Sequence, residues 1–493
     1  MPLVDAKRHR IHRFAAVQRV IGVLLMIFSV TMLPPVLVSH LHENAVEHAF
    51  LTAMLVTLSS GAALWWPVRN GHSELKIRDG FLVVVLFWVV LGLYGAIPFY
   101  IAPRPEVTIA QAVFESISGL TTTGATVLVG IEHLPEGIRF YRQQLQWLGG
   151  MGIVVLAVAI LPMLGIGGMQ LYKAEAPGPV KDNKLTPRIV ETARALWTIY
   201  FGLTMLCALA YRWAGMSWFD AIGHSFSTVA IGGFSTYDAS LGHFDSRLVE
   251  GIAIIFMILA AANFSLHFAA WRARSFAIYR MDPEFRAFVL ILAGLSLIAG
   301  LLLFGSRHFD LADSFITGLF HVVSYGTTSG FTTTDITVWP SFLPAMLLLA
   351  SFIGGCAHST AGGMKVVRVM LVFKQGIREV VRLIHPSAEI PVKLGNKSVS
   401  REIVQAVWGF TSIYMGFFVL LLIAMLATGL DLVTAFSAVA ACINNLGPGL
   451  GEVSSNFAGM NDVALWIGTY AMLLGRLELF PLLVLMTPYF WRR

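Results

Sequence analysis

Apolar residues come in long, nearly unbroken runs along this chain, such as Val20–Val38, Phe81–Ile97, Ile153–Leu164 and Phe417–Leu426. A bilayer core of roughly 30 Å takes about 20 apolar helical residues, so these runs with their flanks can span a membrane. Because hydrocarbon supplies no water, spanning segments must be helices or a closed barrel, and apolarity without a period of two favours helices. The pattern predicts an all-α membrane protein.

The runs predict ten spans. Two come first, near residues 19–38 and 47–66. The first is expected to stay in the chain rather than to be removed as a signal peptide, because its apolar run is long and no small-residue cleavage site follows. The other eight form four pairs, namely 80–101 with 143–164, 192–213 with 248–270, 287–305 with 341–372, and 403–427 with 463–485.

The segment between the two members of each pair is long, moderately apolar and rich in Gly, Ser and Thr. This composition suits a short half-helix that dips into the membrane and returns as extended backbone. Such backbone is tolerated at membrane depth only where protein or a water-filled cavity surrounds it.

These four segments align without gaps, and each predicted half-helix leads to a glycine nine residues after the first aligned residue. The four glycines are Gly124, Gly233, Gly330 and Gly447. A half-helix that enters from outside aims its negative end at the membrane centre, and the glycine lets the backbone turn. Small residues also serve helix packing, so one such loop would be weak evidence. Four loops on one side predict a ring of carbonyl oxygens that replaces the hydration shell of a cation.

The repeats predict the organisation of the chain. An N-terminal helix pair with a cytoplasmic loop takes residues 1–79, and four repeats around a pseudo-four-fold central pore follow. The repeats cover 80–190 with the pore loop 109–126, 191–286 with 217–235, 287–402 with 310–332, and 403–493 with 431–449.

Composition and charge agree with a membrane protein, since 56% of the 493 residues are hydrophobic and 13% are charged. With the N-terminus inside, the segments 1–19, 67–79, 165–194, 271–286, 363–402 and 492–493 hold 27 of the 34 Lys and Arg residues. This bias predicts an inner-membrane protein with both termini in the cytoplasm, and it explains the net charge of +6 without nucleic acid. The outer segments hold fourteen Asp and Glu residues, which either attract cations to the mouth or belong to ordinary solvated loops. They include Glu106, Glu132, Glu136, Asp238, Asp245, Asp335 and Glu452.

Several short motifs resemble the Trk/Ktr/HKT superfamily of K⁺ transporters, most closely its bacterial TrkH members. They are Thr-Thr-Thr-Gly-Ala-Thr at 121–126, Gly-Gly-Phe-Ser-Thr at 232–236, Thr-Ser-Gly-Phe-Thr-Thr at 328–333, Asn-Asn-Leu-Gly-Pro-Gly at 444–449, Gln-Trp-Leu-Gly-Gly-Met-Gly at 146–152, and the stretch 354–365. The resemblance covers nearly the whole chain, and the extra N-terminal pair of spans fits this branch better than the shorter Ktr subunits.

The resemblance implies a selectivity filter within 122–126, 231–235, 328–332 and 445–449. Main-chain carbonyls of Thr122, Thr123, Gly124, Ile231, Gly232, Gly233, Thr328, Ser329, Gly330, Asn445, Leu446 and Gly447 would coordinate K⁺. One glycine per loop is shared, which allows a loose selectivity that admits Rb⁺ or some Na⁺.

A gate is expected where the second helix of the third pair contains four glycines between 354 and 365, at a cost of roughly 1 kcal/mol for each glycine in a helix. The resemblance implies an intramembrane gating loop, whereas a kinked, static packing helix is the alternative. The gate residues are Gly354, Gly355, Cys356, Ala357, His358, Ser359, Thr360, Gly362, Gly363, Lys365 and Arg476. Cys356 and His358 stand where small residues are expected, and His358 either senses pH or is simply hydrogen-bonded in place.

Arg476 lies deep in the last apolar span, where a charge marks a functional position by default. The resemblance implies that it faces the pore below the filter and repels resting cations. Pairing with Glu478 or snorkelling are the alternatives. Lys365 and Arg368 are expected nearer the cytoplasm, on a solvated face.

Other functional classes find little support in the sequence. Nucleotide-loop, dinucleotide, zinc-protease and exposed-nucleophile motifs are missing, which argues against an enzyme. Cys207, Cys356 and Cys442 offer neither a disulfide framework nor metal-ligand spacing. An alternating-access carrier for an organic solute remains the main alternative, although a four-fold repeat favours a pore. Both a gated channel and a H⁺- or Na⁺-coupled symporter stay open, and the lack of a visible proton relay favours channel-like permeation.

Control by nucleotide would need a partner, because the cytoplasmic loops are too short for a nucleotide-binding domain. The resemblance implies a peripheral TrkA-type subunit that binds NAD(H), ATP or ADP and docks on loops such as 165–190 and 374–402. It also implies a homodimer with one pore in each protomer. No cofactor of the chain itself is expected, and K⁺ is the transported ion.

Overall fold

The computed structural model describes residues 14–43, 46–70, 77–155, 189–306 and 309–492. Across these residues the chain is helical, apart from one small hairpin of β1 (Lys393–Leu394) and β2 (Lys397–Ser398). Six helices of the described part are long and apolar enough to cross a membrane, or up to eight if two bent pairs each count as one span. The predicted all-α membrane class is confirmed. The described part does not fix the count of ten spans, because part of the expected span 143–164 lies outside it.

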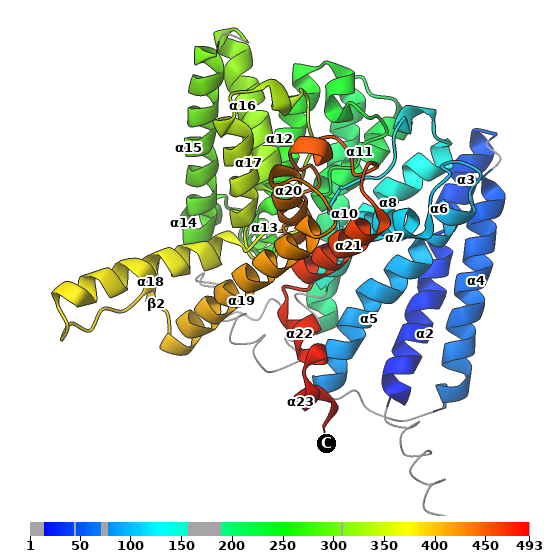
Figure 1. Cartoon of the computed structure of the whole chain (residues 1–493), viewed down its shortest axis with the longest axis horizontal. Coiled ribbons are helices and arrows are strands. Elements are labelled where there is room, and N and C mark those ends of the chain that lie inside the picture. The colour runs from blue at the N-terminus through cyan, green and yellow to red at the C-terminus, as the bar shows by residue number, and fades with distance from the viewer. Residues whose placement is uncertain (1–13, 44–45, 71–76, 156–188, 307–308, 493) are drawn as a thin grey trace, which may run out of the picture.

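The N-terminal helices form an antiparallel pair at one end of the molecule (Figure 1). α2 (Ala15–Val30) continues into α3 (Leu33–Leu41), and α4 (Glu47–Trp65) returns to the short η1 (Trp66–Val68). Gly22 and Gly61 lie where the two helices meet, and a Cβ on either one would be 2.8 Å from the carbonyl oxygen of the other. Small residues at this crossing therefore let the two backbones touch.

Four further stretches share one order of elements: a first helix, a short helix, a return loop with a 3₁₀ turn, and a second helix. The first stretch has α5 (Ile77–Gly95), α6 (Ile97–Ile101), α7 (Ile109–Leu120), η2 (Ile131–His133) and α8 (Glu136–Val155). The second has α10 (Ile189–Trp213), α11 (Trp218–Ala230), η5 (Ser240–Phe244), α12 (Arg247–Ala261), α13 (Phe264–Ala273) and α14 (Ala277–Met281). The third has α15 (Pro283–Gly305), α16 (Leu311–Gly326), η6 (Ile336–Val338), α17 (Phe342–Ile353) and α18 (Val366–Ile384). The fourth has α19 (Arg401–Leu426), α20 (Leu432–Ile443), η7 (Gly451–Val453), α21 (Asp462–Arg476), α22 (Phe480–Met486) and α23 (Pro488–Trp491).

Two of the expected straight spans are sharply bent. α12 and α13 meet at 94°, and α21 and α22 meet at 113°. At the first bend Asn263 leaves the helical region and caps α13 by accepting the Ser265 N–H. At the second, Glu478 and Leu479 both have positive φ angles, which no α-helix accommodates. Apolar patterning gives no sign of either bend, whereas the glycines at 354–365 correctly predicted the interruption between α17 and α18.

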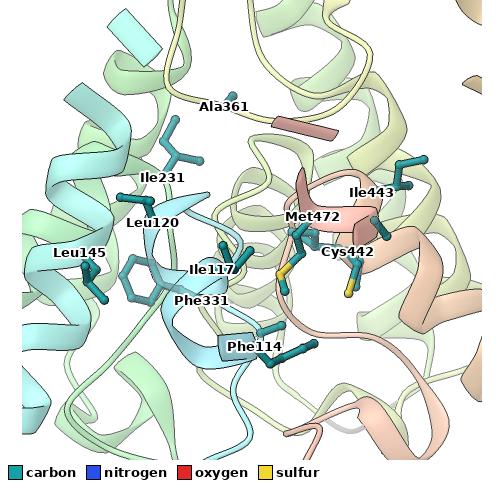
Figure 2. Packing of buried hydrophobic residues seen from close by; sticks show 14 of the residues in the cluster. Phe114, Ile117, Leu120, Leu145, Ile231, Phe331, Ala361, Cys442, Ile443 and Met472 are labelled. Carbon is teal, nitrogen blue, oxygen red and sulfur yellow. The ribbon is translucent and has the colours of Figure 1, made fainter. Parts of the chain in front are cut away.

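The core lies around the short helices α7, α11, α16 and α20, which are buried on nearly every side beyond their first turns. Figure 2 shows apolar side chains from the four stretches in one cluster, among them Phe114, Ile231, Phe331 and Cys442, together with Ala361 of the 354–365 loop. By contrast, α18 and the hairpin extend away from the rest of the molecule (Figure 1).

Candidate functional site

Each of the four short helices begins at a capping side chain. Thr108, Ser217, Asp310 and Asp431 accept hydrogen bonds from backbone amides of the first turn of α7, α11, α16 and α20. Such caps satisfy amides that have no partner inside the helix and fix where the helix starts. Three of the caps stand 16 residues before the aligned glycine, whereas Asp310 stands 20 residues before Gly330, so α16 begins about one turn earlier than the other three helices.

The four short helices also end in the same way. In each loop, the residue just before the aligned glycine (Gly124, Gly233, Gly330 or Gly447) donates its N–H to the carbonyl five residues earlier. This is the 6→1 bond of a Schellman motif. These bonds are Thr123 to Ser118 at 2.8 Å, Gly232 to Ser227 at 2.8 Å, Ser329 to Ser324 at 2.7 Å and Leu446 to Ala441 at 2.8 Å. One geometry thus recurs four times, although the residues differ.

Two residues in each loop adopt left-handed backbone angles. The residue two before the glycine has a φ of 53° at Thr122, 55° at Ile231, 67° at Thr328 and 54° at Asn445. The glycines follow with φ between 75° and 102°. Three of the four non-glycine residues are β-branched, for which this conformation is costly. Strain of this kind persists only where the surroundings over-determine it, and it gathers at functional sites.

The four glycines form a closed ring. A Cβ on each glycine would collide with the carbonyl oxygen of the residue before the next glycine, in chain order and back to the start. The distance from the added Cβ to the carbonyl oxygen is 2.0 Å for Gly124 and Gly232, 2.0 Å for Gly233 and Ser329, 2.1 Å for Gly330 and Leu446, and 2.8 Å for Gly447 and Thr123. Only glycine allows this packing at the first three contacts.

The fourth contact is the loosest of the ring, and a side chain reinforces it. The amide nitrogen of Asn445 donates to the hydroxyl of Thr123 at 2.9 Å and to the carbonyl of Met472 at 3.0 Å. The last loop is therefore tied both to the first loop and to α21.

One cavity of about 400 Å³ opens on the ring, and all four glycines line it. Its wall continues through residues that follow the glycines and includes Arg142, Asp238 and Asp335. Of the sequence-predicted filter residues, the four glycines thus meet at one cavity, although they come from four distant parts of the chain. Every predicted filter residue is buried, apart from the glycines Gly124, Gly233 and Gly330, which are partly exposed.

Side chains of the short helices hold the return loops from behind. In each of the first three loops, the side chain nine residues before the glycine makes a hydrogen bond with a residue two or three positions after the glycine. The contacts are Glu115 with the Val127 N–H at 3.0 Å, His224 Nε2 with the Ser235 hydroxyl at 2.9 Å, and His321 Nε2 with the Thr333 N–H at 3.4 Å. In the fourth loop, where this position is an alanine, Ser437 bonds both the N–H and the carbonyl of Leu450.

Arg142 of α8 joins the first loop to the second. Its side chain is fully buried, pairs with Glu115 at 2.7 Å, and donates to the Ser235 carbonyl at 2.9 Å and the Thr126 hydroxyl at 3.0 Å. One turn further along α8, Gln146 donates to the Gly232 carbonyl at 2.5 Å. A buried guanidinium needs such a complete set of partners, because an unpaired buried charge is strongly destabilising.

The carboxylates at the mouth are held by backbone amides. Asp238 accepts the N–H groups of Gly130 and Ile131 at 2.7 and 3.0 Å, and Glu132 accepts the N–H of Asp238 at 3.2 Å. Backbone hydrogen bonds, from Glu132 itself and from Asp238, lower the pKa of the Glu132 carboxyl group. Hydrogen bonds from Thr337 lower the pKa of Asp335 in the same way. Both groups are therefore negatively charged at neutral pH.

The loop 354–365 packs against the ring. The Gly362 N–H donates to the Thr328 hydroxyl at 2.7 Å, and the Gly363 N–H donates to the Asn444 carbonyl at 3.0 Å. The Thr360 hydroxyl donates to the Val229 carbonyl at the end of α11 at 3.1 Å. A Cβ at Gly362 would be 2.0 Å from the Asn444 oxygen, so the loop packs backbone to backbone. The second, third and fourth stretches all contact it.

Comparisons with known proteins agree with this architecture. The family model described as "Cation transport protein", TrkH, matches residues 46–492. The chain belongs to the TrkH family. It is 56% identical over 475 residues to the Trk system potassium uptake protein TrkH of Halomonas elongata, covering 96% of this chain and 98% of that protein. It is 55% identical over 480 residues to the same-named protein of Escherichia coli K12, covering 97% and 99%. The crystal structure of the potassium transporter TrkH from Vibrio parahaemolyticus superposes with a TM-score of 0.91 at 53% identity, over 97% of this chain and all of that chain.

The charges near the loop of this TrkH-family chain correct one expectation. Lys365 and Arg368 were expected on a solvated face, but they are 6% and 2% exposed, and Arg368 pairs with Glu478 at 2.5 Å. Glu478 is therefore engaged by Arg368, and Arg476 instead donates to the Thr360 carbonyl at 3.1 Å. The bend between α21 and α22 brings Glu478 within reach of Arg368 on α18. Lys365, also buried, donates to the Ala361 carbonyl within the loop.

Sequence reasoning missed several residues that hold the TrkH-family site together. Arg142 was not singled out and Gln146 was named only as the start of a motif, although Gln146 lies inside the expected span 143–164 and Arg142 directly before it, which is a signal for an interior role. Glu284 was also missed, because it lies in a basic segment that was interpreted only as a cytoplasmic flank. Its carboxylate contacts the 354–365 loop.

Proposed function

We propose that this chain takes up K⁺ across the bacterial inner membrane through the ring of four loops. The family assignment and the named function of its relatives support potassium uptake. The observation that carries the proposal is the closed ring, in which each glycine packs on the carbonyl of the next loop and all four line one cavity.

In the proposed filter, K⁺ exchanges its water shell for main-chain oxygens. The ring residues alternate between left-handed and ordinary backbone angles, so successive carbonyls need not point to opposite sides as in a strand. The negative ends of α7, α11, α16 and α20 lie at the ring, where they favour a cation. The filter consists of residues 122–124, 231–233, 328–330 and 445–447, and hard oxygen ligands suit an alkali ion.

In the proposed topology, the N-terminal pair precedes four repeats around a pseudo-four-fold pore, giving ten spans with both termini in the cytoplasm. The shared caps, Schellman ends and order of elements support four repeats. The concentration of Lys and Arg in alternate loops supports this orientation.

The proposed gate is the loop 354–365 together with Arg476. The loop lies against Thr328 of the ring and against the ends of α11 and α20, so a cation leaving the filter meets it first. Arg476 donates to the carbonyl of Thr360, which places its positive charge beside the loop. This charge would repel a cation until the loop and the arginine move together.

Regulation is proposed to come from outside the chain. A cytoplasmic TrkA-type subunit that binds NAD(H), ATP or ADP would dock on exposed elements such as α18 and the β1–β2 hairpin, and the chain would work as a homodimer. The expected second docking loop, 165–190, lies almost wholly outside the described residues.

The test is uptake of radioactive Rb⁺ into liposomes that contain the purified protein, with K⁺, Na⁺ and organic solutes as competitors. We expect K⁺ to compete best and Gly330→Ser to lower the K⁺ over Na⁺ preference by about tenfold, equivalent to about 1.4 kcal/mol. Gly429→Ser is the matched control, because Gly429 also has a positive φ of 95° but a Cβ there meets nothing within 4 Å. Uptake that organic solutes block and cations do not would refute the pore.

A further inference from the structure

Glu284 lies in the first turn of α15, behind the proposed gate. The helix is capped by Asp282, which accepts the Phe285 N–H at 2.8 Å. Glu284 itself is 2% exposed, an unusual position for a carboxylate. Its burial calls for specific partners, because a buried carboxylate is costly unless it is hydrogen-bonded.

Two of its partners belong to the two ends of the loop 354–365. The Glu284 Oε1 atom accepts the N–H of Ala357 at 2.7 Å and the N–H of Val367 at 3.3 Å. Ala357 lies near the start of the loop 354–365, and Val367 lies just past its end. One oxygen atom on α15 thus contacts both ends of the segment that has to move.

Helix α13 also contacts the loop 354–365. The N–H of Phe264, the first residue of α13, donates to the carbonyl of His358 at 3.3 Å. α13 leads through α14 directly into Asp282 and Glu284. The bent corner of α13, α14 and the start of α15 therefore contacts three backbone groups, two in the loop and one just past its end, namely the Ala357 N–H, the His358 carbonyl and the Val367 N–H.

We propose that Glu284 is a positioning residue that pins both ends of the loop 354–365 to α15 and so holds the gate shut. This inference rests on the proposed role of the loop as the gate. A movement of the α13–α15 corner would pull directly on the loop through this carboxylate. Its carboxylate accepts hydrogen bonds from backbone groups at the two ends of the loop, so its role is to set the loop's position rather than to bind the ion.

A native cysteine in the loop can report changes in the position of the loop. Cys356 lies next to Ala357 in the loop and is 1% exposed. In a Cys207→Ala, Cys442→Ala background Cys356 is the only cysteine of the chain. A second background that keeps only Cys442, buried in α20, reports general loosening of the fold.

The experiment measures the rate at which a small maleimide modifies each cysteine in full-length protein in liposomes, together with Rb⁺ uptake. We expect Glu284→Ala to raise the rate at Cys356 by about tenfold and Rb⁺ uptake severalfold, with Cys442 unchanged. Glu284→Gln keeps an Oε1 acceptor and should change both by less than about threefold. Glu250→Gln is the matched control. Glu250 is also a buried first-turn glutamate, but it lies on α12 and pairs with Arg247 of the same helix at 2.7 Å.

Each outcome is informative. An unchanged rate at Cys356 in Glu284→Ala, or an equal rise at Cys442, would overturn the inference. A faster rate at Cys356 with unchanged Rb⁺ uptake would support Glu284 as the anchor while contradicting the proposal that the loop is the gate. The two failures are therefore distinguishable.

Discussion

The amide of Gly362 donates a hydrogen bond of 2.7 Å to the side-chain hydroxyl of Thr328. Thr328 is one of the left-handed ring residues, and Gly362 belongs to the loop beneath the ring. The proposed filter and the proposed gate are thus in direct contact through this bond. A loop that moves away must leave a buried amide without its acceptor, which couples the state of the gate to the filter.

Replacing Thr328 by valine should loosen the loop. Valine keeps the β-branched shape but cannot accept the Gly362 N–H, and an unsatisfied buried donor costs about 1–3 kcal/mol. We expect faster Rb⁺ uptake in the absence of any partner subunit. Thr122→Val provides the comparison, because Thr122 holds the equivalent ring position and its buried hydroxyl makes no hydrogen bond among the described residues. Equal effects of the two variants would show that the bond to Gly362 is unimportant.

Arg476→Ala should also raise uptake in the absence of a partner. The charge lies beside the loop through its bond to the Thr360 carbonyl, and its removal lowers the barrier to a passing cation. Arg476→Lys keeps the charge and should stay within about twofold of the unchanged protein. The measurement is the initial rate of Rb⁺ entry under an imposed membrane potential. Identical rates for all three proteins would exclude an electrostatic barrier at this position.

The pair Arg142–Glu115 should matter for both stability and selectivity. Breaking a buried pair by removing one partner costs about 3–5 kcal/mol, so Arg142→Gln should lower the melting temperature markedly. In the protein that still folds, K⁺ over Na⁺ preference should fall, because Arg142 also holds the Ser235 carbonyl of the second loop. Arg382→Gln is the control, since its pair with Glu379 is half exposed and worth less than about 1 kcal/mol. A selectivity that stays unchanged would limit Arg142 to a structural role.

The sequence predicted the main outlines of this molecule because they depend on local patterns. Long apolar runs fix the helices, and one glycine in each aligned segment marks the loop that follows a short helix, as Gly124 does after α7. The bends at Asn263 and Glu478 were not predicted, because the apolar pattern gives no sign of either one. Arg368 was misjudged for the same reason, since its partner Glu478 reaches it only through the bend.

The carboxylates Glu132 and Asp335 at the proposed pore mouth should stay negatively charged at moderately acidic pH. Hydrogen bonds from backbone amides lower the pKa of Glu132, and those from Thr337 lower that of Asp335. A carboxyl group with a lowered pKa stays ionised above its folded-state pKa, and any stability it contributes is lost only as the pH falls through that value. The K⁺ concentration for half-maximal uptake should therefore be constant from pH 8 to about pH 5 and rise below about pH 4. Glu132→Gln should raise this concentration modestly and equally at pH 8 and pH 5. A rise between pH 7 and pH 6 in the unchanged protein would contradict this account and point to a titrating histidine instead.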